Sequence, residues 1–322
     1  MKLNGTLFFV VSSLLLLLHA CVERNISIVQ KGDWTLKSAF EGVGRNAAAA
    51  FVIGDLAYVG TGSDNSRQPL SDFWRYDPST NTWSQWANFP AKARSEAVTF
   101  SVGTKGYLGA GVDQTTGTLL KDFYQYDPVT NAWKRVADFG GSARRSAVAF
   151  SVGSSGFVCT GNDGREQRDM WQYNTDTDTW TRKADFGGSA RVGAATFVIN
   201  NRGYVGTGAT NSVNQTDLWA YDPANDSWTK RQDFSSAALT NSSRVYGVGF
   251  AIDGIGYLAT GAGATDVWAY DPVGDFWVDK AAFDGTSRSQ AVGFAIGSKG
   301  YITTGVNGST SFSDLWAFDP GL

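Results

Sequence analysis

The sequence predicts an all-β fold made of six similar units. An arginine is followed six residues later by a phenylalanine and thirteen residues later by a second aromatic residue, and this spacing recurs six times. The distance between units varies while the spacing inside each unit is fixed, which is typical of a repeat architecture. The six arginines are Arg45, Arg94, Arg144, Arg191, Arg244 and Arg288.

Each unit reads as four short strands. The first is small and apolar, as in residues 47–53, 97–102 and 247–252. The second ends at a glycine four residues after its aromatic, which suits a turn or a bulge. In the third, aromatics alternate along the chain, as at Trp74 and Tyr76, so that they share one face of a strand.

A tight hairpin is expected between the third and fourth strands. In residues 77–81, Pro78 suits a position with φ near −65° and Asn81 tolerates a left-handed conformation. Sustained helical periodicity is absent from the sequence after the N-terminal apolar segment. With 38 glycines and 14% aromatic residues, the composition also fits a turn-rich β protein.

The repeats resemble the Kelch repeat from Gly32 to the C-terminus. The residues that carry the resemblance are the repeated arginine, a Gly-Tyr pair such as Gly106-Tyr107, the pattern Asp-x-Trp-x-Tyr-Asp-Pro and a later tryptophan. Two departures occur: Thr-Gly or Ala-Gly replaces the usual Gly-Gly, and Asn174-Thr175 replaces Asp-Pro. The resemblance implies a six-bladed β-propeller in which each repeat forms one four-stranded blade.

The two ends of the chain are expected to complete one blade together. The sixth unit stops at Leu322 without its fourth strand, and the missing Trp-to-Phe spacing occurs instead at Trp34 and Phe40. An N-terminal strand in residues 33–40 is therefore expected to close the ring and leave no open sheet edge. The propeller is expected to occupy residues 32–322, with blades at 45–89, 94–139, 144–186, 191–234, 244–283 and 288–322 plus 33–40.

The N-terminus resembles the signal peptide of a bacterial lipoprotein. Lys2 precedes an apolar run that is short for a membrane span, and residues 18–21 read Leu-His-Ala-Cys, similar to a lipobox. The resemblance implies removal of residues 1–20, lipidation of Cys21, a short tether over residues 21–31, and anchoring in the cell envelope, at the outer membrane, cell surface or periplasm. The alternative is an ordinary secretory signal with an incidental cysteine.

Charge and composition exclude several classes of function. The net charge of −3 and pI near 5.2 argue against a nucleic-acid partner. The one histidine, His19, lies in the signal segment, so the remaining chain has no Ser-His-Asp triad and no histidine for a metal site. The copper site of galactose oxidase, which also has a Kelch propeller, has no counterpart. No metal and no cofactor are expected, since the Asp-rich stretches fall at turns.

Two interpretations of the repeated arginines follow from strand order, which places all six around the mouth of the central channel. They could bind an anionic ligand or an acidic partner. Alternatively, each pairs within its own blade, and six-fold repetition favours this structural role. The expected partners are Asp72, Asp122, Asp169, Asp217, Asp266 and Asp314.

The predicted function is a binding or scaffolding module. Loops of variable length surround the channel mouth, and they are the usual place for recognition of a protein or a glycan. The alternative is a carbohydrate-active proton-transfer enzyme, because some bacterial envelope Kelch propellers are sialic-acid mutarotases. Glu96, two residues after Arg94, is then the candidate catalytic residue, and a pocket that places it near an arginine would favour this alternative. A second alternative is a purely structural envelope protein.

Overall fold

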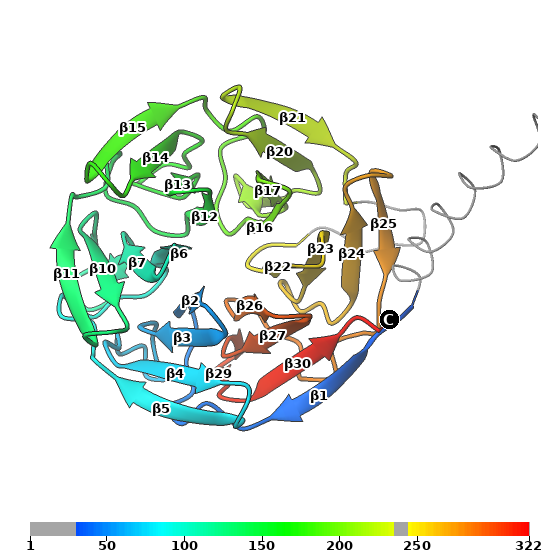
Figure 1. The fold of residues 1–322 in the computed structure, drawn as a ribbon, viewed down its shortest axis with the longest axis horizontal. Coiled ribbons are helices and arrows are strands. Elements are labelled where there is room, and N and C mark those ends of the chain that lie inside the picture. The colour runs from blue at the N-terminus through cyan, green and yellow to red at the C-terminus, as the bar shows by residue number, and fades with distance from the viewer. Residues whose placement is uncertain (1–29, 235–243, 322) are drawn as a thin grey trace, which may run out of the picture.

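The computed structural model describes residues 30–234 and 244–321 and forms a six-bladed propeller, as predicted (Figure 1). The signal segment, Cys21, most of the tether and the connection at 235–243 lie outside these residues. Six four-stranded antiparallel sheets surround a central axis. In the part of the chain that is described, no helix is both long and apolar enough to cross a bilayer.

The strands of each blade run in order from the axis outward (Figure 1). Blade one consists of β2 (Ala49–Ile53), β3 (Leu56–Gly60), β4 (Phe73–Asp77) and β5 (Thr82–Trp86). Blade two consists of β6 (Val98–Val102), β7 (Lys105–Gly109), β10 (Phe123–Asp127) and β11 (Ala132–Val136). Blade three consists of β12 (Val148–Val152), β13 (Ser155–Cys159), β14 (Met170–Asn174) and β15 (Thr179–Lys183).

The second half of the ring follows the same plan. Blade four consists of β16 (Ala195–Ile199), β17 (Arg202–Gly206), β20 (Leu218–Asp222) and β21 (Ser227–Arg231). Blade five consists of β22 (Val248–Ile252), β23 (Ile255–Ala259), β24 (Val267–Asp271) and β25 (Phe276–Asp279). Blade six consists of β26 (Val292–Ile296), β27 (Lys299–Thr303), β30 (Leu315–Asp319) and β1 (Asp33–Lys37).

The N-terminal strand closes the ring, and this prediction is confirmed. Strand β1 pairs with β30 in antiparallel register, with Trp34 opposite Phe318. The buried Trp34 indole packs edge-on against Phe283 at 5.0 Å between ring centroids, and its Nε1 donates to the carbonyl of Ala281 at 3.1 Å. Blade six is therefore held to blade five by residues from the start of the chain.

The other blades use the same tryptophan contact. In each, Nε1 of the outer-strand tryptophan donates to a backbone carbonyl of the preceding blade. The five pairs are Trp83 with Ser38, Trp133 with Ala87, Trp180 with Ala137, Trp228 with Ala184 and Trp277 with Gln232.

The core lies between neighbouring blades. The ring of Phe51 stacks on Tyr58 in its own blade and extends to Gly106 of blade two, where an added Cβ would lie 2.3 Å from the Phe51 ring. This close approach explains the glycine of the Gly-Tyr pair, because a side chain at Gly106 would displace the aromatic ring.

The innermost strands begin later than the sequence predicted. Residues 47–53, 97–102 and 247–252 were expected to be extended, whereas β2, β6 and β22 begin at Ala49, Val98 and Val248. The residue two positions after each arginine has a positive φ, which is incompatible with a strand. It falls inside the predicted strand only in blade one, at Ala47, and the strands of blades two and five begin a single residue later than expected. The φ values are 50° at Ala47, 56° at Glu96, 55° at Ser146, 59° at Gly193, 56° at Tyr246 and 55° at Gln290.

Candidate binding site at the channel mouth

The six repeated arginines are buried and paired inside their blades. Arg94 shows the arrangement: Nη1 and Nη2 donate to the two carboxylate oxygens of Asp122 at 2.7 and 2.8 Å. Nη1 also donates to the carbonyl of Ala110, and Nε donates to that of Lys92, both at 3.1 Å. The guanidinium lies 4.7 Å from the centre of the Phe89 ring. Four of the five guanidinium hydrogens are therefore already used.

Every arginine has the aspartate partner that the structural interpretation named. The pairs are Arg45 with Asp72, Arg94 with Asp122, Arg144 with Asp169, Arg191 with Asp217, Arg244 with Asp266 and Arg288 with Asp314. Each arginine side chain is 0% exposed. They offer a ligand no accessible guanidinium.

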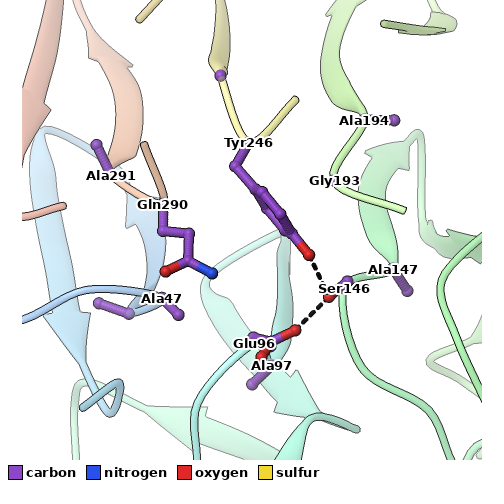
Figure 2. A pocket seen from close by; sticks show the side chains of 12 residues that line it. Ala47, Glu96, Ala97, Ser146, Ala147, Gly193, Ala194, Tyr246, Gln290 and Ala291 are labelled. Atoms are coloured by element: carbon purple, nitrogen blue, oxygen red, sulfur yellow. Dashed lines mark hydrogen bonds between the residues drawn. The ribbon is translucent and has the colours of Figure 1, made fainter. Parts of the chain in front are cut away.

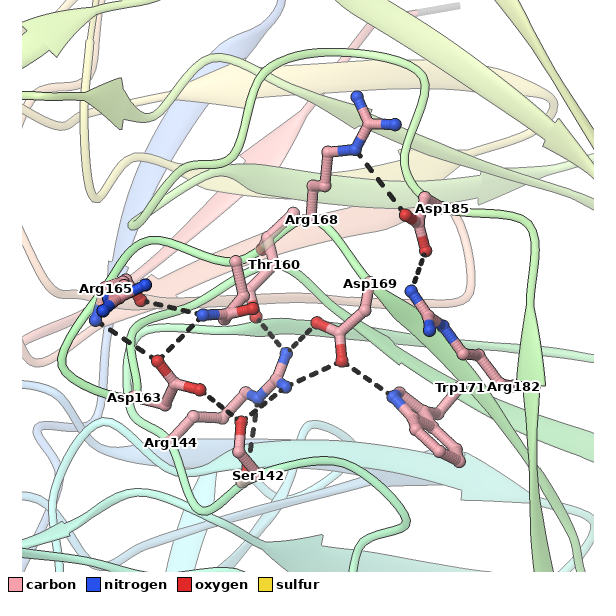
Figure 3. A network of polar contacts seen from close by, with 11 residues as sticks. Ser142, Arg144, Thr160, Asp163, Arg165, Arg168, Asp169, Trp171, Arg182 and Asp185 are labelled. Atoms are coloured by element: carbon pink, nitrogen blue, oxygen red, sulfur yellow. Dashed lines mark hydrogen bonds and ion pairs between the residues drawn. The ribbon is translucent and has the colours of Figure 1, made fainter.

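Asp72, Asp169 and Asp217 are held in the charged form by their arginine partners. Burial works to raise the pKa of Asp169, but hydrogen bonds from Arg144 and Trp171 and the charge of Arg144 outweigh it, so the pKa lies below its ordinary value. Figure 3 shows this pair within a wider network, in which Ser142 Oγ donates to Asp163 at 2.6 Å. The network stabilises blade three, and its hydrogen bonds already use all the N–H groups of the Arg144 guanidinium.

The expectation that the arginines ring the channel mouth is wrong. Each side chain turns back into its blade, and the mouth is lined instead by the residues two and three positions further along. We call the first of these sets the mouth ring. It consists of Ala47, Glu96, Ser146, Gly193, Tyr246 and Gln290.

The mouth ring is tied together by a closed circle of backbone hydrogen bonds. The N–H group of each member donates to the carbonyl of the member in the preceding blade. The distances are 3.0 Å for Glu96 to Ala47, 3.3 Å for Ser146 to Glu96, 3.2 Å for Gly193 to Ser146, 2.8 Å for Tyr246 to Gly193, 3.1 Å for Gln290 to Tyr246 and 2.9 Å for Ala47 to Gln290. Because these backbone groups bond one another, the side chains determine what the mouth can bind.

Polar side chains of the mouth ring form a connected chain on one side of a hollow of about 150 Å³ (Figure 2). The Ser146 hydroxyl donates to Oε2 of Glu96 and lies 3.1 Å from the Tyr246 hydroxyl. Because the Ser146 hydrogen is directed at a carboxylate, the Tyr246 hydroxyl is the donor in the second bond. Arg145 approaches the other Glu96 oxygen at 3.4 Å.

The surroundings of Tyr246 also shift the pKa of its hydroxyl. Burial raises the pKa of its hydroxyl above the ordinary value, and the charge of Glu96 raises it further. Across the hollow, the amide of Gln290 faces the same space (Figure 2). The site therefore offers a carboxylate acceptor, a neutral hydroxyl on an aromatic ring and an amide that can both donate and accept.

The channel continues below the mouth between the innermost strands. It has a volume of about 260 Å³ and is lined by small residues, with threonines only at Thr99 and Thr196 among its described lining residues. Clusters of His, Cys, Asp and Glu suited to a metal ion are absent from residues 30–234 and 244–321. The chemistry of the site is thus concentrated at the mouth.

The loops after the second strands lie on the same face as the mouth, as predicted. In five of the six units the residue after the arginine bridges to the start of such a loop, for example Ser95 to Val112 and Arg145 to Asn162. Three of the loops form short hairpins. These are β8 (Val112–Asp113) with β9 (Thr118–Leu119), β18 (Ala209–Thr210) with β19 (Val213–Asn214), and β28 (Val306–Asn307) with β29 (Thr310–Ser311).

Sequence reasoning found Glu96 but missed Arg145, Ser146, Tyr246 and Gln290. The signal was weak. The position two after each arginine holds a different residue in every unit, but the position before it varies as well, and only the position after it repeats, as alanine in five units and glycine in blade five. Glu166, the other glutamate of the repeats, lies away from the mouth and accepts a hydrogen bond from the backbone N–H of Asn211 at 2.9 Å.

Comparisons with known proteins agree with this architecture. The family model for the KLHDC2/KLHL20/DRC7 Kelch-repeats domain matches residues 29–193. The solved structure of YjhT superposes with a TM-score of 0.73 over 86% of this chain and 95% of that chain, at 14% sequence identity. No curated protein matches the sequence. The chain belongs to the Kelch-repeat family.

Proposed function

We propose that this protein is a binding module that recognises a group of a glycan or a protein partner at its channel mouth. Kelch propellers generally mediate interactions, and the observation that carries the proposal is the mouth ring. Its six members share one backbone conformation but carry six different side chains. An accessible ring of positions that differ in every unit of a regular scaffold is a suitable place for specificity.

The electrostatics of the mouth support a ligand with little net charge. Glu96 is the only charged member of the mouth ring, and Arg145 lies beside it, so the two charges offset each other. Ser146, Tyr246 and Gln290 add neutral hydrogen-bonding groups. A ligand that presents hydroxyl or amide groups can replace the water bound there without leaving a buried charge unpaired.

The proposal is tested with a glycan array together with crosslinking to partners in the native envelope. Wild type should retain a defined set of ligands, and Gln290→Ala and Glu96→Gln should each weaken binding about tenfold or more, as expected for the loss of a hydrogen bond to a charged or buried group. Val129→Ser, in a hairpin on the opposite face, is the control and should bind like wild type. Equal binding by all four proteins would refute the assignment.

A second candidate function is proton transfer on a carbohydrate, as in a sialic-acid mutarotase or epimerase. The observation that favours it is the position of Glu96, which lies in the pocket with Arg145 at 3.4 Å. A carboxylate so placed can act as a general base once a sugar hydroxyl comes within hydrogen-bond reach. Anomerisation of sialic acid is measured with wild type and Glu96→Gln, and background rates for both would remove this candidate.

We also propose that lipidation of Cys21 anchors the protein in a bacterial envelope. Cys21 lies outside the described residues, so the support is the lipobox-like sequence together with the position of β1. This strand begins at Asp33 opposite Asp319, at the hairpin face, so an anchor before it turns the channel mouth away from the membrane. Retention of Cys21→Ser in the membrane fraction would refute the lipid anchor. A protein that binds no ligand in the glycan array and crosslinking experiments would support a purely structural envelope role.

A further inference from the structure

Gly193 leaves a space in the mouth ring that another residue occupies. An added Cβ at Gly193 would lie 2.8 and 2.9 Å from two carbons of the Tyr246 ring and 2.7 Å from Val245. These separations are shorter than any that a real Cβ accepts, so no side chain fits at position 193 while Tyr246 keeps its place. The aromatic ring of blade five therefore lies over the mouth-ring position of blade four.

This placement lets Tyr246 reach past a whole blade. Its hydroxyl contacts Ser146 of blade three, and Ser146 in turn donates to Glu96 of blade two. The side chains thus connect blades two to five along one arc of the mouth (Figure 2). The arc left open lies between Gln290 of blade six, Ala47 of blade one and the inner edge of Glu96.

We propose that Gly193 and Tyr246 form a pair that determines specificity by closing one arc of the mouth and directing the ligand into the other. In the open arc a ligand meets Tyr246 as an aromatic wall, Glu96 as an acceptor and the Gln290 amide. This set fits one neutral sugar residue, which offers hydroxyl donors and acceptors around an apolar C–H face. The identity of the ligand rests on the proposed function, whereas the closing of the arc does not.

Two positions elsewhere in the chain separate this effect from backbone strain. Ala47 occupies the equivalent mouth-ring position with a φ of 50°, so the ring accepts a Cβ in this conformation. Gly103 has a φ of 57°, close to the 59° of Gly193, and among the described residues no atom lies within 4 Å of a Cβ added there. Gly103→Ala therefore measures the conformational cost alone, and Gly193→Ala adds the collisions with Tyr246 and Val245.

The experiment is a double-mutant cycle of Gly193→Ala and Tyr246→Ala, with Gly103→Ala as the control. Gly193→Ala should lower the melting temperature more than Gly103→Ala does, and the excess should become smaller in the Tyr246→Ala background, where only the contact with Val245 remains. Tetranitromethane nitration, mapped by mass spectrometry, gives the second readout. Displacement of Tyr246 into solvent should raise its nitration clearly above that of wild type, because the buried ring becomes accessible to the reagent and burial no longer raises the pKa of its hydroxyl. An equal loss of stability in both backgrounds, or unchanged nitration, would overturn the closed arc.

Ligand entry is tested on wild type with neutral methyl glycosides of glucose, galactose and mannose as probes. At least one should slow nitration of Tyr246 about threefold at twice its dissociation constant, and Gln290→Ala should abolish this protection. Absence of protection by all three overturns the ligand class. The double-mutant cycle uses no ligand, so an absence of protection would not contradict the closed arc. Failure of the proposed function is therefore distinguishable from failure of the arc.

Discussion

Replacing a repeated arginine should cost stability rather than binding. In Arg94→Met the carboxylate of Asp122, whose side chain is only 22% exposed, loses both hydrogen bonds from the guanidinium. Removing one partner of a buried ion pair typically costs about 3–5 kcal/mol because the remaining charge is uncompensated. For a chain of this size each kcal/mol corresponds to roughly 2 °C, so we expect the melting temperature to fall by about 6–10 °C.

The assay is thermal unfolding followed by near-ultraviolet circular dichroism, because the buried aromatic layers report directly on the ring. The matched control is Lys92→Met, two residues away, whose side chain is 62% exposed and lies 3.5 Å from Asp113. It should change stability by no more than about 0.5 kcal/mol. If Arg94→Met melts like Lys92→Met but loses ligand binding, the arginine belongs to a site and the structural interpretation is wrong.

Three further predictions concern the closing strand, the free thiol and the aspartates. Trp34→Ala should lower the unfolding free energy by about 3–5 kcal/mol in a urea titration, since it removes a buried indole that joins two blades, and an unchanged midpoint would contradict closure by β1. Cys159 should resist iodoacetamide in the native state, because complete burial raises the pKa of its thiol to about 12; rapid labelling before unfolding would contradict this. Burial opposes ionisation of Asp72, Asp169 and Asp217, but their arginine partners hold each pKa below the ordinary value of 3.8. Their contribution to stability is present above that value and is lost as the pH falls through the lower folded pKa, so a melting temperature that already drops steeply near pH 5 would contradict it.

Repetition explains which features the sequence could predict. The Arg–Asp pairs, the four-strand units and the closing role of Trp34 all depend on residues that recur at fixed spacing, so each unit supported the assignment made in the others. The positive φ after each arginine has no such signal, because residues as different as Ala47 and Tyr246 adopt it. The sequence therefore did not predict it, and the strand expected in blade one included Ala47.

The candidate site was predictable only in part for the same reason. Glu96 drew attention because glutamates are rare in the repeats, whereas Ser146 and Gln290 are ordinary surface residues in a linear sequence. Their significance comes from the ring, which brings together positions from six units. The contact between Tyr246 and Ser146 spans 100 residues and depends on the empty position at Gly193, which no local pattern reveals.

The pairing of β1 with β30 places a condition on the order of folding. Strand β1 is synthesised early, but it cannot complete its pairing with β30 until Asp319 has been made. Until then blade six lacks its outer strand. Such long-range pairing makes the final step slow and keeps the incomplete chain open.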